Sequence, residues 1–182
     1  MQGSRGVLWS RWLEIEEAGR KMPSFDVVSK VQMHEVDNAV QQTSKEIGTR
    51  YDFRDTGASI ERTEEGIVLR ANSEGRIEAA FTVLQEKLVR RKVSLKSIDP
   101  QKAEPVGGSA FRQLVKITQG LSTEKAKDVV KFLKSSGLKV QGAIHGDQVR
   151  VTGGKKDVLQ AAIGQMRNQD FGVELQFENY RD

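Results

Sequence analysis

The chain has 182 residues, of which 30% are charged and 37% are hydrophobic, and its formal net charge is +4. A chain of this length holds one domain of ordinary size or two small ones of about 70–90 residues. It contains no cysteine, which excludes disulfides, iron–sulfur clusters, cysteine-rich zinc sites and thiol nucleophiles. No apolar run approaches the roughly 18 residues of a membrane span, so we expect a cytoplasmic protein.

The first 21 residues differ from the regular pattern that begins at Met22. They hold both tryptophans of the chain, Trp9 and Trp12, and charged residues interrupt their short apolar segment. This interruption argues against a secretory signal. We expect residues 1–21 to be a poorly ordered N-terminal extension, and a partner-docking helix is the alternative.

Apolar periodicity in residues 22–99 predicts the order β-α-β-β-α-β. One helix is expected over Met33–Ile47, with Gly48 placed to end it, and a second is expected after Ser73, whose hydroxyl can cap it. The expected strands are Ser24–Val31, two strands around Tyr51–Phe53 and Ser59–Arg62, then Ile67–Asn72 and Val93–Ile98. The turn residues of 100–110 then predict a linker.

The same order repeats in residues 111–182. The expected strands are Phe111–Thr118, Leu138–Ile144, Gln148–Thr152 and Val173–Phe177, and the expected helices run from Ser122 to Gly137 and over Asp157–Asn168. Such a repeat has the element order of the ferredoxin-like fold. We therefore predict an α+β protein of two tandem ferredoxin-like domains, 22–99 and 111–182, each an antiparallel sheet with two helices on one face.

Basic residues are concentrated in the stretch Ala110–Lys156. It holds ten Lys or Arg residues and three acids, a net charge of +7, while the whole chain is only +4. Such a local excess is what an anion-binding surface needs. Strand alternation places basic side chains on the open face of each sheet, the face without helices. The candidates for phosphate contacts on these faces are Arg70, Arg112, Lys116 and Arg150.

A second candidate phosphate site precedes the last helix. It consists of Gly153, Gly154, Lys155 and Lys156. Amide groups at a helix N-terminus, the helix dipole and two ammonium groups would suit a phosphate. A turn that needs glycine at positive φ would give the same sequence. The stretch lacks the G-x-x-x-x-G-K-[ST] pattern, so hydrolysis of a nucleoside triphosphate has no support.

No pattern for metal binding or covalent chemistry is evident. The two histidines, His34 and His145, are far apart in the sequence and have no cysteines beside them, which makes a poor metal site. Serine-nucleophile motifs and converging carboxylate pairs are absent as well. We therefore predict a binding protein that is not an enzyme and needs neither a metal nor a cofactor.

Several stretches resemble the YajQ family of bacterial proteins. They are MPSFDVVSKV from Met22, HEVDNAVQQTSKEIGTRYDF from His34, KFLKSSGLKVQ from Lys131, IHGDQVRVTGGKKDVLQAAI from Ile144 and the terminal LQFENYRD. The resemblance covers residues 22–182. It implies that two ferredoxin-like domains exchange their first strands, so that Ser24–Val31 pairs in the C-terminal sheet and Phe111–Thr118 in the N-terminal sheet. The exchange would place Arg112 and Lys116 beside Arg70, and Lys30 beside Arg150.

The resemblance also implies a function, because the family is described as nucleotide-binding. Some members are associated with RNA, and others act as cyclic di-GMP effectors. We therefore expect a nucleotide-binding protein for cyclic di-GMP or a GTP-like nucleotide that acts through a regulatory protein partner. The family supplies no catalytic motif and assigns no ligand contact here.

Two alternatives remain open. RNA is the first, bound to a basic sheet face, although the open faces lack the aromatic residues with which RNA-recognition domains stack bases. A protein-interaction or chaperone-like module is the second. Apolar Val28, Val68 and Leu114, expected on the open faces, would suit a protein partner.

Overall fold

The structure, a computed structural model, describes residues 22–182; the predicted N-terminal extension, residues 1–21, lies outside the described residues. The helices are α2 (Met33–Thr49), α3 (Glu74–Arg90), α4 (Thr123–Ser135) and α5 (Lys156–Arg167), with the short 3-10 helices η1 (Tyr51–Phe53) and η2 (Leu95–Ser97). The strands are β1 (Ser24–Val28), β2 (Ser59–Arg62), β3 (Ile67–Ala71), β4 (Ile98–Pro100), β5 (Glu104–Pro105), β6 (Phe111–Ile117), β7 (Val140–His145), β8 (Gln148–Gly153) and β9 (Gln176–Arg181).

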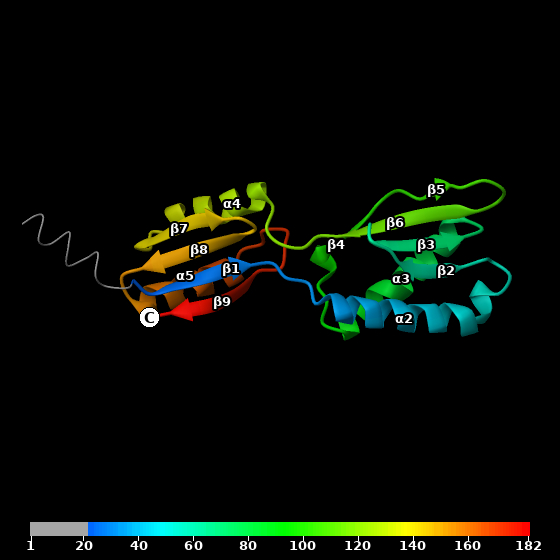
Figure 1. Ribbon diagram of the computed structural model, residues 1–182, viewed down its shortest axis with the longest axis horizontal. Coiled ribbons are helices and arrows are strands. Elements are labelled where there is room, and N and C mark those ends of the chain that lie inside the picture. The colour runs from blue at the N-terminus through cyan, green and yellow to red at the C-terminus, as the bar shows by residue number, and fades with distance from the viewer. Residues whose placement is uncertain (1–21) are drawn as a thin grey trace, which may run out of the picture. The chain divides into compact units, whose positions relative to one another are not determined.

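The strands form two antiparallel sheets (Figure 1). One has the order β7-β8-β1-β9, and the other has the order β2-β3-β6-β4 with β5 paired to β6. Contacts divide the chain into two compact units. Among the described residues, unit 1 holds residues 22–28, 121–171 and 175–182, and unit 2 holds residues 29–120 and 172–174. Strand β1 thus lies with C-terminal elements, and β6 lies with N-terminal ones.

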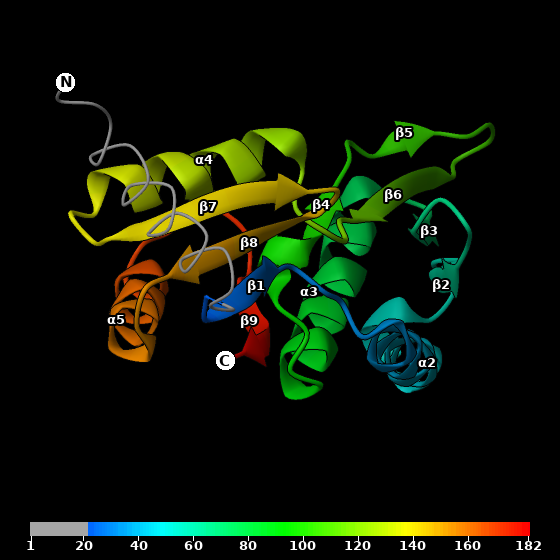
Figure 2. The same cartoon turned by 60° about the vertical axis from the view of Figure 1, so that its left-hand side comes forward.

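This architecture is compatible with the predicted pair of ferredoxin-like domains. In each sheet, antiparallel strands are accompanied by two helices, α4 and α5 in unit 1 and α2 and α3 in unit 2 (Figure 2). The two units follow spatial contacts, whereas the predicted limits at 22–99 and 111–182 follow the sequence repeat. Those limits stay a prediction.

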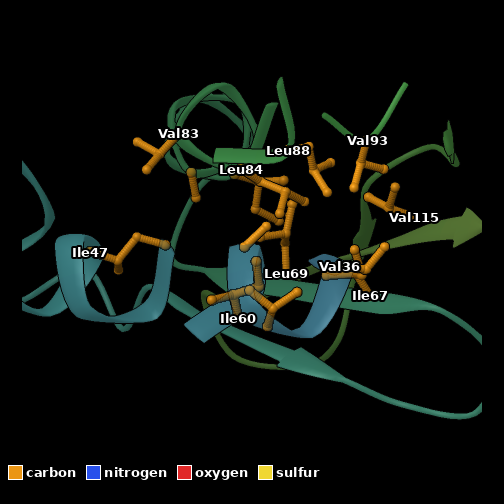
Figure 3. Packing of buried hydrophobic residues seen from close by; sticks show 14 of the residues in the cluster. Val36, Ile47, Ile60, Ile67, Leu69, Val83, Leu84, Leu88, Val93 and Val115 are labelled. Carbon is orange, nitrogen blue, oxygen red and sulfur yellow. The ribbon is translucent and has the colours of Figure 1, made fainter. Parts of the chain in front are cut away.

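The core of unit 2 lies between its sheet and helices α2 and α3 (Figure 3). Each helix presents apolar residues three and four positions apart, which places them on one face. The buried set includes Val36, Ala39, Val40 and Ile47 from α2, Ile77, Ala80, Leu84 and Leu88 from α3, and Ile67, Leu69 and Val115 from the sheet. Thr43 shares the buried face of α2, where its hydroxyl donates to the Ala39 carbonyl at 2.8 Å. Alternate residues of β3 and β6, among them Arg70 and Arg112, therefore point to the open face.

The core of unit 1 is built in the same way. Phe25 and Val27 of β1 lie in register with Val151 and Val149 of β8, and all four are buried. They face the buried residues Ala126, Val129, Leu133, Leu159, Ala162, Ile163 and Met166 of α4 and α5. The intervening residues of the two strands, Asp26 and Arg150, are therefore neighbours on the open face of this sheet.

Several predicted local signals are confirmed. The Ser73 hydroxyl accepts from the Arg76 amide at 3.4 Å and caps α3, and the Ser122 hydroxyl accepts from the Lys125 amide at 3.3 Å and caps α4. Gly137 has a φ of 74° just beyond α4, a conformation that favours glycine. These ends follow from local chemistry that a sequence displays directly.

Other predicted elements are wrong in type or position. Tyr51–Phe53 forms η1 and not a strand, because the Phe53 amide donates to the Arg50 carbonyl at 3.2 Å and the Arg54 amide donates to the Tyr51 carbonyl at 3.1 Å. Helix α2 continues through Gly48 to Thr49, since the Arg50 amide still donates to the Glu46 carbonyl at 2.9 Å.

The ends of both halves differ as well. The strand predicted over Val93–Ile98 is replaced by η2 and by β4, which begins only at Ile98. The strand predicted over Val173–Phe177 lies further on as β9, because Gln176 and Phe177 are the residues in register with Val28 and Val27. The predicted linker 100–110 contains β5, which pairs with β6.

Candidate functional site

Arg70 and Arg112 lie directly opposite each other on the open face of the unit 2 sheet. They are in register across β3 and β6, and Ser59 and Glu104 extend the same row on either side. The two side chains keep 49% and 32% of their surface exposed. Like charges placed opposite each other on neighbouring strands destabilise a sheet unless an anion or an acidic side chain neutralises them.

In this structure, acidic side chains provide that neutralisation. The Arg70 guanidinium donates to the Glu61 carboxylate at 2.7 Å, and the Arg112 guanidinium lies 3.7 Å from the Glu65 carboxylate. Both acids are largely exposed, and such ion pairs contribute only about 0–1 kcal/mol. These acids therefore hold the guanidinium groups only weakly.

Lys116 does not lie beside Arg70, contrary to the expectation. It is four residues beyond Arg112 on β6, which is about 13 Å along a strand, and its register partner is Asp99 of β4. The pairing of β3 with β6 places Arg112 alone opposite Arg70. Lys116 remains exposed on the same face of the sheet.

Arg150 lies in the other sheet and has a buried partner. Its Nε donates to Oδ1 of Asp26 at 2.9 Å and its Nη2 donates to Oδ2 at 3.2 Å, while Asn179 donates to the same Oδ2 at 3.0 Å. The expectation that Lys30 lies beside Arg150 is wrong, because the register partner of Arg150 is Asp26. The sequence reasoning missed Asp26, although an acid inside an apolar strand, FDVV, was a visible signal.

The pKa values of this pair follow from its geometry. The Arg150 hydrogen bonds hold the pKa of Asp26 below its usual value, against burial, which raises it; the Asn179 amide assists the arginine. Reciprocally, the hydrogen bond to Asp26 raises the pKa of Arg150. Two nitrogen atoms of the Arg150 guanidinium thus already donate to a buried carboxylate. The predicted phosphate contact of Arg150 would have to use the other N–H groups of the guanidinium.

The apolar positions expected on the open faces are not exposed. Val28 and Val68 are buried and Leu114 is partly buried. Val68 lies in register between Leu114 and Glu61, whose side chains flank it on the same face. The exposed apolar surface that favoured a protein-interaction module is therefore absent at these three positions.

The Gly-Lys stretch before α5 is explained in part by packing. Neither glycine has a positive φ, so the turn interpretation is wrong. The Gly153 amide donates to the Pro23 carbonyl at 3.1 Å, and a Cβ at this position would lie 3.0 Å from the Leu159 side chain. Gly154, Lys155 and Lys156 are exposed, and the Lys156 ammonium pairs with Asp182 at 2.8 Å.

The predicted site residues are therefore divided between the units. Arg70, Arg112 and Lys116 belong to unit 2, whereas Arg150, Gly153, Gly154, Lys155 and Lys156 belong to unit 1. Among these predicted residues, Arg70 and Arg112 are the pair that strand pairing brings side by side.

Two further properties bear on the chemistry. Among residues 22–182, no group of three or more His, Cys, Asp or Glu side chains is arranged to hold a metal ion. Within the same range, the helices are too short or too polar to cross a membrane.

Comparison with known proteins identifies the family. The family model described as "Nucleotide-binding protein YajQ-like" matches residues 23–181. A protein of Anaeromyxobacter sp. (strain K) named "Nucleotide-binding protein" is 55% identical over 162 residues, which cover 88% of this chain and 100% of the relative. Similarly named proteins of Parafrankia sp. (strain EAN1pec) and Desulfitobacterium hafniense (strain DSM 10664 / DCB-2) are 53% and 47% identical, over 87% and 88% of this chain and 98% and 99% of their own length. The chain therefore belongs to the YajQ-like family of nucleotide-binding proteins.

Proposed function

We propose that this protein binds a nucleotide through its phosphate groups at Arg70 and Arg112 and acts as an effector without catalytic activity. The observation that carries the proposal is the in-register position of the two exposed arginines on β3 and β6. Two guanidinium groups on adjacent strands can donate several parallel hydrogen bonds to one phosphate or to two neighbouring ones. The names of the relatives support the same ligand class.

Cyclic di-GMP is the nucleotide that we propose first, with GTP as the closest competitor. It carries two phosphates and two guanine bases, and arginine recognises both phosphate oxygens and the O6 and N7 edge of guanine. An effector of this kind passes its bound state to a regulatory protein partner.

RNA is the second candidate. It is favoured by the line of basic side chains along the open face of β6, Arg112 and Lys116, which suits the backbone of a single strand. RNA affinity would fall steeply with salt, with a slope of about −0.7 per neutralised phosphate, whereas a small nucleotide in a defined site depends less on salt.

A calorimetric titration with cyclic di-GMP, GTP and a short single-stranded RNA at two salt concentrations tests the proposal. The double variant Arg70→Gln/Arg112→Gln should bind the nucleotide at least about a hundredfold more weakly than the parent. The matched control Lys127→Gln/Lys131→Gln removes the same charge from exposed positions of α4 and should bind like the parent. Equal nucleotide affinity of the parent and the arginine variant would contradict the proposed site.

A further inference from the structure

Tyr51 is the most exposed large hydrophobic side chain among residues 22–182. It keeps 84% of its surface accessible, although its neighbour Phe53 on the same 3-10 helix is buried. An aromatic ring exposed to this extent gains little from packing within its own chain. The sequence pattern predicts a strand at this position and therefore gives no sign of the exposed ring.

The backbone that carries Tyr51 is fixed from several sides. The Arg50 guanidinium donates to Asp52 at 2.9 and 2.8 Å and to Glu46 of α2 at 3.2 Å. After η1, the Thr56 hydroxyl donates to the Phe53 carbonyl at 2.7 Å, and the Thr56 carbonyl accepts from the Asn72 amide at 2.8 Å. The ring is therefore presented from an anchored turn, which lowers the entropy lost when a ligand packs on it.

A guanidinium accompanies the ring. The Cζ atom of Arg54 lies 5.7 Å from the centroid of the Tyr51 ring. Within the part of the chain that the structure describes, Arg54 forms no ion pair with an acidic side chain. A planar ring beside an unneutralised guanidinium is the combination on which nucleobases stack, because every base has a π-face and arginine adds cation–π attraction.

We propose that Tyr51, assisted by Arg54, is a stacking platform for an unpaired nucleobase. The inference rests on the proposed function and deepens it, because it names the side chain that holds the base while Arg70 and Arg112 hold phosphate. The Tyr51–Arg54 pair and the two arginines belong to unit 2. The loop after η1 leads into β2, whose first residue Ser59 is the register partner of Arg70. The base can come from a free nucleotide or from a single strand of RNA.

Fluorescence of 2-aminopurine reports stacking directly, since stacking quenches it. The probes are 2-aminopurine riboside triphosphate, a short single-stranded RNA with a central 2-aminopurine, and the same RNA in a duplex. They are titrated against the full chain and against Tyr51→Ala and Tyr51→Phe. The matched control is Tyr180→Ala, which removes the second, likewise exposed tyrosine of the chain. Far-ultraviolet circular dichroism and thermal unfolding confirm that each variant is folded.

The parent should quench the fluorescence of an unpaired probe but not of the duplex. Tyr51→Ala should lose the quenching and bind about tenfold more weakly. Tyr51→Phe should retain both properties, because phenylalanine keeps the π-face, and Tyr180→Ala should behave like the parent. If Tyr51→Ala loses binding to the triphosphate, the base comes from a free nucleotide. If Tyr51→Ala loses binding to the RNA alone, the base comes from single-stranded RNA.

The opposite results separate this inference from the proposed function. If the parent binds a probe and Tyr51→Ala binds it equally well with equal quenching, the stacking platform is wrong and nucleotide binding stands. The exposed Tyr–Arg pair would then fit a protein interface, where these residues are also enriched. If the parent binds only the single-stranded RNA, with quenching that depends on Tyr51, the platform stands with RNA as its ligand, and the titration with cyclic di-GMP and GTP decides the nucleotide proposal. If the parent binds none of the probes, the stacking platform is overturned, and the titration with cyclic di-GMP and GTP decides the proposed function.

Discussion

The buried carboxylate of Asp26 on β1 accepts two hydrogen bonds from the guanidinium of Arg150 on β8, at 2.9 and 3.2 Å. The Asp26 side chain is only 2% exposed, whereas that of Arg150 is 31% exposed. The pair joins residues 124 positions apart and fixes the register of the N-terminal strand against a C-terminal one. Arg150 therefore stabilises the sheet, whatever further contact its remaining donors make.

Replacing Arg150 should destabilise unit 1. In Arg150→Met, the Asp26 carboxylate stays buried with Asn179 as its remaining side-chain donor, and an uncompensated buried charge costs about 3 kcal/mol. Urea denaturation measures the free energy of unfolding. Lys131→Met, which removes an exposed charge from α4, is the control and should change the stability little. A stability equal to that of the parent would show that water replaces the guanidinium without cost.

The Asp26–Arg150 pair also predicts a pH dependence. The folded pKa of Asp26 is lowered by the Arg150 hydrogen bonds, so its stabilising contribution is present above the unfolded pKa of about 4 and is lost as the pH falls through the folded pKa. The pKa values of Glu46, bonded to Lys87, and of Asp52, bonded to Arg50, are lowered too and act in the same direction. Comparison of the parent with Asp26→Asn isolates the Asp26 contribution.

The melting temperatures of these two proteins should differ at pH 5 to 7 and should converge below pH 4. A constant difference over the whole range would mean that packing, and not ionisation, distinguishes the two side chains.

Gly66 is a glycine at which substitution should be strongly damaging. Its φ is 148°, and a Cβ at this position would lie 2.3 Å from the Val115 carbonyl oxygen of the neighbouring strand. Because backbone atoms cannot move aside as a flexible side chain can, Gly66→Ala should destabilise unit 2 by about 3 kcal/mol or more. Gly154→Ala is the matched control, since Gly154 has an ordinary φ and no atom within 4 Å of a new Cβ. Thermal unfolding of both variants gives the comparison, and equal melting temperatures would contradict the steric argument.

The sequence predicted the helices better than the strand ends, and there is a physical reason. Helix signals such as the Ser73 cap or the stripe of α3 depend on residues within two turns of each other. Strand limits depend on a partner far away in the chain. Strand β9 begins at Gln176 because Gln176 pairs with Val28, the last residue of β1, and Ile98 lies in a strand because it pairs with Ile117. Local periodicity carries no record of such partners.

The candidate site shows the same division. Alternation within β3 and β6 was sufficient to place Arg70 and Arg112 on an open face, and the resemblance supplied their pairing. The acidic partners Glu61 and Glu65 could not be predicted, because they reach the arginines across a strand pair or a turn. Asp26 is visible as an acid inside an apolar strand, but its pairing with Arg150 depends on a distant strand. The exposure of Tyr51 could not be predicted either, because the sequence pattern predicts a strand over Tyr51–Phe53, where the structure has η1.

Replacing an acid beside the arginine pair should strengthen nucleotide binding, whereas replacing the arginines should weaken it. Glu61 now neutralises Arg70 at 2.7 Å, yet both side chains are about half exposed, so their ion pair contributes at most about 1 kcal/mol. If a phosphate displaces Glu61, then Glu61→Gln should bind the nucleotide about two- to fivefold more tightly than the parent, because the carboxylate no longer competes or repels. Glu124→Gln on α4 makes the same charge change on an exposed helix and controls for the net charge. Weaker binding by Glu61→Gln in the same titration would mean that Glu61 holds Arg70 in the orientation that binds the ligand.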